Sequence, residues 1–263
     1  MNKQRALKLK KKLSAGEITA GIWVQLPSPV AFEVIADGGF DWVVVDSEHS
    51  TYNRETLLYM LMAFKASQTA AVIRVPWNEP AVVKQMLDMG FDGIMFPGIG
   101  CLQDAEMAVS ACRYPPLGRR GFGPIRISGY SGPGQVEYAK DANDAVICAL
   151  QIENVSASQE IQQILKLPGI DWIMFGPNDL SGTAGSFLDT SHPDVQQAIR
   201  KMQEAAQAAG IPYSGGMGSR EAVEAALKDG CQLIFLGDDI SFLQSGMANA
   251  LKMFDQAVSG ITK

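Results

Sequence analysis

Three polar, ionisable residues follow directly on a short apolar run in the first fifth of the chain. In the stretch GFDWVVVDSEHS, an uninterrupted apolar run ends at Val45, and Asp46, Glu48 and His49 come next. Such a run is typical of a strand that is covered on both faces. Catalytic groups in parallel α/β folds lie at the carboxyl ends of strands, so this stretch is a candidate site. A solvated loop with a helix cap is the alternative, and this stretch alone does not decide between them.

Polar residues also end other apolar runs. Arg74 lies in VIRVP, Gln151 and Glu153 lie in LQIEN, and FGPNDLS contains Asp179. A guanidinium inside an apolar strand needs an acceptor, either a protein carboxylate or a substrate oxyanion. Two carboxylates from adjacent strands, Glu153 and Asp179, suit a hard divalent cation such as Mg²⁺ or Mn²⁺. Taken singly, Asp179 is equally well a helix N-cap and Glu153 a polar strand end.

The chain has two histidines, and they differ in context. His192 precedes Pro193 at an expected helix start, which is typical of a cap or a surface residue. A histidine next to Asp46 can be held in one tautomer for general acid–base work, so His49 is a candidate proton carrier. No lysine ends a strand, which disfavours Schiff-base and pyridoxal phosphate chemistry. The absence of a GxSxG motif disfavours acyl transfer.

Short apolar runs alternate with helical stretches along the whole chain. The expected strands are Gly21–Leu26, Asp41–Asp46, Ala70–Pro76, Gly93–Gly98, Val146–Glu153, Asp171–Pro177, Pro212–Gly216 and Leu233–Asp238. The expected helices are Pro29–Asp37, Asn53–Ser67, Pro80–Met89, Leu102–Arg113, Ser156–Leu165, Pro193–Ala209, Ser219–Lys228 and Ile240–Ala257. Eight strand–helix units predict one α/β domain over residues 1–263, a (β/α)8 TIM barrel that brings the site residues to one face. A doubly wound sheet is the runner-up, but no GxGxxG follows its first strand.

Two segments depart from this alternation. The stretch MNKQRALKLKKKLSAG predicts an amphipathic N-terminal helix that ends at Gly16, with its lysines on a solvated face. The segment from Arg113 to Val146 is longer than an ordinary connection, and such loops are usually functional. Its Arg119, Arg120 and Arg126 either meet an anion or hold the loop to the barrel. No GK[ST] follows its glycines, so it is not a phosphate loop.

Composition excludes several classes of partner. The net charge of −6 argues against nucleic acid and against an acidic membrane surface. No signal-like segment and no apolar run of about 18 residues is present, which predicts a cytoplasmic protein without a membrane partner. The four cysteines form no CxxC pair, so we expect reduced thiols and neither a disulfide framework nor a zinc site.

Six pieces of the chain, taken in order, resemble the HpcH/HpaI class II pyruvate aldolases. The resemblance runs from about residue 20 to residue 254 and is carried by GFDWVVVDSEHS, VIRVPWNEP, KQMLDMG, RYPPLGRRGFG, LQIEN and FGPNDLSG. It implies a metal-dependent carbon–carbon lyase that reversibly cleaves a 4-hydroxy-2-oxo acid to pyruvate and an aldehyde through a pyruvate enolate. The long segment carries Arg126-Ile127-Ser128, and the loop after the seventh strand reads SGGMG. Both depart from the family's usual residues, so the aldehyde stays open.

The resemblance also implies roles for single residues. Glu153 and Asp179 would hold Mg²⁺, Mn²⁺ or Co²⁺, and Arg74 would stabilise the enolate oxygen. His49, oriented by Asp46, would move protons at the aldehyde oxygen. The implied pyruvate contacts are Arg74, Gln151, Gly176 and Asn178.

The resemblance further implies a homohexamer. Its C-terminal helices, here Ile240–Ala257, would be exchanged between subunits, and Asp88 would reach a neighbour's site.

Three other functions stay open from the sequence. A CoA-ester lyase of the citrate or malyl type and an oxaloacetate-decarboxylating synthase would use the same enolate chemistry. A non-catalytic barrel kept as a binding or assembly protein is the third, but it would not need Arg74, Glu153 and Asp179 together.

Overall fold

The computed structural model describes residues 3–261 and contains a sheet of eight parallel strands. Strand neighbours run in the order β6-β5-β4-β3-β2-β1-β8-β7, and a parallel bridge between Ile173 and Tyr213 joins the two ends into a nearly closed barrel. The strands are β1 (Thr19–Val24), β2 (Trp42–Asp46), β3 (Ala70–Arg74), β4 (Gly93–Ile99), β5 (Ile147–Ile152), β6 (Trp172–Phe175), β7 (Ser214–Gly215) and β8 (Leu233–Asp238). The predicted (β/α)8 barrel is confirmed, and the doubly wound alternative is wrong because β1 lies between β2 and β8.

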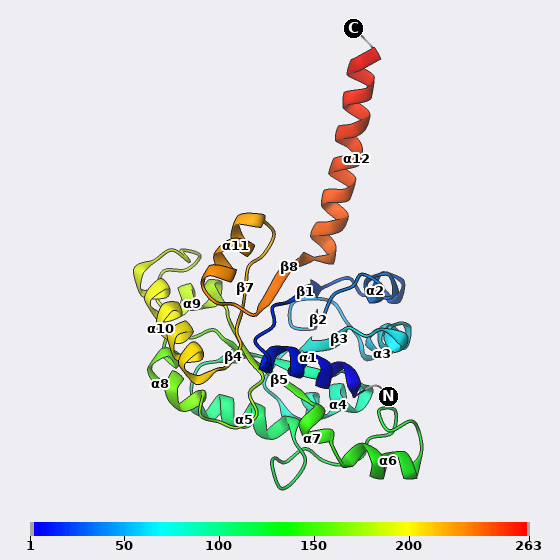
Figure 1. Ribbon diagram of the computed structural model, residues 1–263, viewed down its shortest axis with the longest axis vertical. Helices are drawn as coiled ribbons and strands as arrows, with labels where there is room; N and C mark the ends of the chain where they lie inside the picture. The colour runs from blue at the N-terminus through cyan, green and yellow to red at the C-terminus, as the bar shows by residue number, and fades with distance from the viewer. Residues whose placement is uncertain (1–2, 262–263) are drawn as a thin grey trace.

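Helices surround the barrel, and most lie where they were predicted (Figure 1). They are α1 (Gln4–Ser14), α2 (Pro29–Ala36), α3 (Arg54–Ala63), α4 (Pro80–Met89), α5 (Leu102–Cys112), α6 (Gly132–Ala139), α7 (Ala142–Ala145), α8 (Ala157–Ile164), α9 (Pro177–Thr183), α10 (Pro193–Ala209), α11 (Arg220–Lys228) and α12 (Asp239–Ile261). The short helices α6, α7 and α9 were not expected. Proline stands in the first turn of both α6 and α9, where its missing N–H costs nothing.

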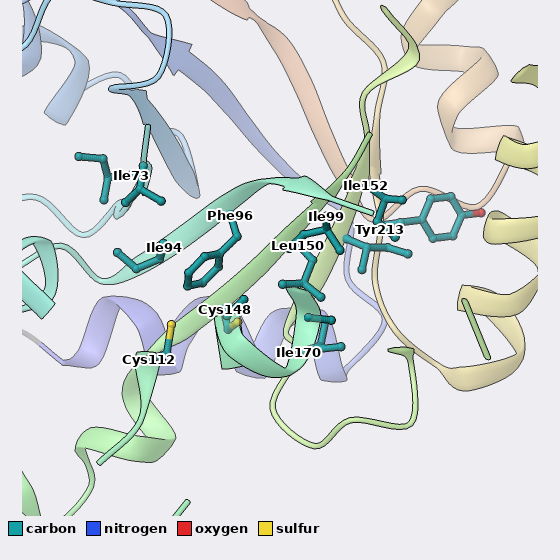
Figure 2. Close-up of a cluster of buried hydrophobic side chains, with 14 of the residues drawn as sticks. Ile73, Ile94, Phe96, Ile99, Cys112, Cys148, Leu150, Ile152, Ile170 and Tyr213 are labelled. Carbon is teal, nitrogen blue, oxygen red and sulfur yellow. The ribbon is translucent and has the colours of Figure 1, made fainter. Parts of the chain in front are cut away.

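Each strand sends alternate side chains to opposite faces, and both faces are buried. Side chains such as Trp42 and Val44 fill the inside of the barrel, whereas Val43 and Val45 join the cluster between strands and helices. Figure 2 shows part of this outer cluster, with Ile73 among its members. Burial on both faces explains why the strands read as continuous apolar runs.

A short repeat marks the amino ends of three strands. Gly-Phe-Asp, Gly-Phe-Asp and Gly-Ile-Asp immediately precede β2, β4 and β6, and end in Asp41, Asp92 and Asp171. Each aspartate accepts a hydrogen bond from a backbone amide of the preceding strand, at 3.0, 2.8 and 2.8 Å respectively. These carboxylates fasten the strands in pairs at the amino end of the barrel.

Helix α1 covers this amino end of the barrel. Its Leu9 and Leu13 belong to the apolar cluster inside the barrel. Its cations pair with the three aspartates, Arg5 with Asp92 at 3.0 Å, Lys10 with Asp171 at 2.9 Å and Lys12 with Asp41 at 2.7 Å. The expectation of a solvated lysine face is therefore wrong for Lys10 and Lys12, because a ring of carboxylates lies beneath them.

The Arg5–Asp92 pair gives a test of this packing. Both side chains are almost fully buried, and removing one partner of such a pair leaves an uncompensated charge. We expect Arg5→Ala to lower the free energy of unfolding by about 3 to 5 kcal/mol at pH 7. Urea denaturation measures this change, and Lys8→Ala on the exposed face of α1 is the matched control.

The same variant has a predicted pH dependence. Burial raises the pKa of Asp92 to about 6, although Arg5 and an amide oppose the rise. The native state therefore holds this proton more tightly than the unfolded state, and stability falls as pH rises from about 4 through 6. Without Arg5 the native pKa rises further, so the loss is larger at pH 7 than at pH 5. Equal free energies of unfolding for Arg5→Ala and Lys8→Ala at pH 7 would contradict a stabilising role of the Arg5–Asp92 pair.

Candidate active site

The carboxyl ends of β2 and β3 place a carboxylate beside a guanidinium inside the barrel. Asp46 and Arg74 are partners in the β2–β3 register, and both continue the inward-facing set of their strands. Arg74 Nε lies 2.9 Å from Asp46 Oδ1, and Nη2 lies 2.7 Å from Oδ2. The carboxylate is fully buried. This two-pronged contact answers the question that the sequence left open, because the acceptor for Arg74 is a protein carboxylate.

The remaining terminal nitrogen of Arg74 points to two further side chains. Nη1 lies 3.1 Å from Glu48 Oε2 and 3.4 Å from Gln151 Oε1. The amide of Gln151 in turn donates to Glu153 Oε1. A continuous line of polar contacts thus runs from β2 through β3 to the end of β5.

Opposing influences act on the Asp46 carboxyl. Burial raises its pKa, but the hydrogen bond and charge of Arg74 lower it, as do the backbone amides of Glu48 and His49. These amides lie 3.2 and 3.3 Å from Oδ1. The net effect holds the pKa of Asp46 below its ordinary value, so the group stays ionised beside the guanidinium.

His49 lies at the mouth of this cluster, with 67% of its side chain exposed. Its Nε2 is 3.7 Å from Glu48 Oε2. The expected contact between Asp46 and the imidazole is not made, because the carboxylate is engaged by Arg74 and by backbone amides. Asp46 therefore fixes the loop that carries His49, and the nearest carboxylate to the ring is that of Glu48.

Glu153 follows β5, and glycines make room for it. Its Oε2 accepts from the amide of Gly98, which has a φ of 67°, in the left-handed region that favours glycine. A Cβ on Gly176 would come within 2.7 Å of Glu153 Cγ, so a larger residue there would displace the carboxylate. Burial raises the pKa of Glu153 to about 7, and the negative charges of Glu48 and Asp179 add to the rise.

Asp179 stands in the first turn of α9, exposed, beside the exposed Asn178. The N-cap of α9 is Gly176, so the N-cap alternative for Asp179 is wrong. Glu153 and Asp179 fit a cation site with two protein ligands, because their mutual repulsion is what a divalent ion would relieve. Within residues 3–261, no group of three or more acidic, histidine or cysteine side chains is placed to hold a metal ion.

Several residues that the sequence analysis singled out lie away from this cluster. The Asp88 carboxylate, on α4, is 2.6 Å from Arg120 Nη2 in the long segment after α5. Arg126 donates to the carbonyl of Met89, so the arginines hold this segment to α4. His192 caps α10 by accepting from the amide of Asp194, as expected.

Two further contacts of Arg74 had little signal in the sequence. Trp23, inside the apolar run of β1, lies with its ring centroid 4.6 Å from Arg74 Cζ. Glu48 was the neighbour of His49 in sequence, but its contact with Arg74 depends on how the loop after β2 turns. Gly98 had one local signal, a glycine at a strand end, where positive φ values are common.

Comparison with known proteins places the chain in a family. The model of the HpcH/HpaI aldolase/citrate lyase family matches residues 19–245. The chain belongs to this family. Over 239 residues it is 36% identical to the 5-keto-4-deoxy-D-glucarate aldolase of Escherichia coli K12, covering 90% of this chain and 93% of that enzyme.

Solved structures agree with this assignment. An HpcH/HpaI aldolase/citrate lyase family protein from Burkholderia cenocepacia J2315 superposes with a TM-score of 0.88 at 32% identity, over 94% of this chain and 99% of that one. The HpcH/HpaI aldolase of Desulfitobacterium hafniense DCB-2 gives 0.84 at 30% identity, over 94% and 96%. The predicted resemblance and the prediction of a carbon–carbon lyase of the aldolase type are confirmed.

The space around Glu153 gives a test of the metal site. We expect Gly176→Ala to push the Glu153 carboxylate aside and to weaken Mn²⁺ binding about tenfold or more, as disturbance of ligand-supporting groups does. Titration calorimetry with Mn²⁺ measures this. Gly182→Ala, inside α9, is the control, because its Cβ would make an ordinary contact of 3.7 Å. Equal Mn²⁺ affinities in the two variants would contradict the assignment.

Proposed function

We propose that this protein is a metal-dependent aldolase that reversibly cleaves a 4-hydroxy-2-oxo acid to pyruvate and an aldehyde. The observation that carries the proposal is the guanidinium of Arg74, held by two carboxylates and linked through Gln151 to Glu153. Sequence similarity to a sugar-acid aldolase over nine tenths of the chain supports the reaction type. A 2-oxo acid offers the two oxygens that such a site would bind.

The metal would supply Lewis acidity at the ketone oxygen of the substrate, and Mg²⁺, Mn²⁺ or Co²⁺ held by Glu153 and Asp179 would serve. Arg74 faces the charge that develops on the same oxygen when the carbon–carbon bond breaks, and its fixed orientation requires no rearrangement at that moment. Gln151, Gly176 and Asn178 would bind the pyruvate part and keep it in register with Arg74.

His49 carries the proton step at the other half of the substrate. In cleavage its imidazole accepts the proton of the C4 hydroxyl, the C3–C4 bond breaks, and the electron pair of that bond forms the enolate of pyruvate. The aldehyde leaves with its new C=O bond, a proton from water then adds to C3 to give pyruvate, and the imidazole returns its proton to solvent. The position of His49 at the open mouth suits contact with the aldehyde half, which is the half that varies among such substrates.

The two histidines permit a matched test of this function. We expect His49→Ala to reduce pyruvate release from a 4-hydroxy-2-oxo acid about a hundredfold, the usual contribution of a general acid–base group. Exchange of the pyruvate methyl protons with deuterium should fall much less, because it needs no proton at the aldehyde oxygen. His192→Ala, at the N-cap of α10, is the control for loss of a histidine. Equal losses of both activities in His49→Ala would place the histidine at the methyl group instead.

We propose in addition that the protein is a homohexamer with exchanged α12 helices. In the structure α12 extends away from its own barrel (Figure 1). Large apolar side chains along one side of it are exposed, namely Leu243, Met247, Leu251, Phe254 and Val258. Contact with another subunit would bury this stripe, and Asp88 would then reach a neighbour's site.

The apolar stripe of α12 makes the assembly testable. We expect Leu251→Lys to reduce the particle to smaller species, because a lysine cannot be buried at low cost in an apolar contact. Gln256→Lys, from the opposite side of the helix, is the control and should leave the mass unchanged. Light scattering after size-exclusion chromatography measures the mass. An unchanged mass for Leu251→Lys would contradict the exchange.

A CoA-ester lyase remains the second candidate, because the family's description also includes citrate lyase. In that reaction the same Arg74 would stabilise the thioester enolate that forms when the carbon–carbon bond breaks, and the carboxylate pair would hold the metal that binds the 2-oxo acid product. Release of an aldehyde with pyruvate, set against release of a CoA ester, separates the two reactions.

A further inference from the structure

We propose that Trp23 is a positioning residue that fixes the plane of the Arg74 guanidinium. The inference deepens the proposed function, since it concerns the group that would stabilise the enolate. It starts from the contact between the indole ring and Arg74 Cζ, 4.6 Å from the ring centroid. A guanidinium at this distance from a tryptophan face is attracted to the ring's electrons.

The polar contacts of Arg74 hold one edge of its guanidinium more closely than the other. Asp46 grips one edge of the guanidinium at 2.9 and 2.7 Å, whereas Nη1 is held only at 3.1 Å by Glu48 and at 3.4 Å by Gln151. The Asp46 edge can therefore act as a hinge, and tilting about it displaces Nη1 most. Nη1 also donates to Gln151, whose amide nitrogen donates to Glu153. The indole ring, with Arg74 Cζ over it at 4.6 Å from its centroid, opposes that tilt.

Trp23 is itself rigidly held. Its ring stacks on Phe235 of β8, with centroids 5.0 Å apart and planes 9° from parallel. Phe235 packs edge-on against Trp42, at 4.6 Å and 82°. The indole N–H of Trp42 donates to Thr19 Oγ1 at 3.0 Å. An aromatic column therefore connects the guanidinium to the middle of the barrel, with only 7% of Trp23 exposed.

The backbone just after Trp23 is pinned as well. The Asp239 carboxylate accepts from the amides of Gln25 and Leu26, at 2.9 and 3.0 Å. The hydroxyl of Tyr52 donates to the carbonyl of Val24 at 3.0 Å. The end of β1 cannot swing outward without breaking these bonds, so the indole forms a fixed wall beside Arg74.

Three variants separate the ring's face from its bulk. Trp23→Phe keeps an aromatic face, Trp23→Leu keeps only an apolar side chain, and Trp77→Leu removes a tryptophan that is 69% exposed just after β3. With Mn²⁺, we expect the turnover of pyruvate methyl deuterium exchange to fall about tenfold in Trp23→Leu and about threefold or less in Trp23→Phe. The KM for pyruvate should change much less than turnover, and Trp77→Leu should match the wild type.

The kinetic outcomes either support or overturn the proposal. Equal turnover in Trp23→Leu and Trp77→Leu would overturn it. So would equal losses in Trp23→Phe and Trp23→Leu, because bulk and not the ring face would then be responsible.

A crystal structure of Trp23→Leu gives a second arm that does not depend on activity. A tilted guanidinium or two orientations of it would support the proposal, and an unchanged guanidinium would overturn it. If the wild type shows no exchange, the proposed function fails, and this arm alone decides the role of Trp23.

Discussion

The buried ion pair between Asp46 and Arg74 is the constraint on which the site depends. Removing two charges from water costs several kcal/mol for each ion, and only good geometry offsets that cost. Here a hydrogen bond of 2.9 Å and a second ion-pair contact of 2.7 Å, set by the direct register pairing of β2 with β3, bring the two charges together. The pair anchors one edge of the guanidinium, and from that edge Nη1 reaches Glu48 and Gln151. Arg74 therefore cannot be removed for a functional test without stranding a buried carboxylate.

The two ends of the barrel use the same elements for different purposes. At the amino end, Asp41, Asp92 and Asp171 each have an amide and a cation as partners, and α1 closes over them. At the carboxyl end the carboxylates outnumber the cation that faces them, and burial raises the pKa of Glu153 to about 7. Satisfied charges suit a stabilising role, whereas an excess of negative charge suits binding of a cation. This difference follows the general rule for such barrels, in which the amino end contributes stability and the carboxyl end carries the chemistry.

Much of this architecture follows from local patterns in the sequence. The range Leu233–Asp238 was predicted to the residue, as were Pro80–Met89 and Pro193–Ala209, because glycines, prolines and apolar periodicity mark their ends. The meeting of Asp46, Arg74, Gln151 and Glu153 followed from the barrel prediction alone, since strand ends converge in that fold. The short helix α9 was missed because its seven residues are too few to show the apolar periodicity that distinguishes a helix from the loop after a strand.

Side-chain partnerships were harder to predict than positions. The sequence places His49 near Asp46, but Arg74, 28 residues further along the chain, occupies the carboxylate that the imidazole was expected to contact. The lysines of α1 look solvated until the Asp41 and Asp171 carboxylates are placed under them. Trp23 reads as one more apolar strand residue, and only the register of the barrel brings its ring to Arg74. Competition for a partner is decided by tertiary contacts, which no local pattern contains.

The most direct test of the central claim is deuterium exchange into the methyl group of pyruvate, followed by proton NMR with the wild-type protein. It would be run with Mg²⁺ or Mn²⁺ and again with excess chelator, so that it reports enolate formation without any choice of aldehyde. Arg74, Glu153 and Asp179 acting as proposed predict exchange that depends on the metal and stops when the metal is removed. No exchange with either metal would contradict the enolate site.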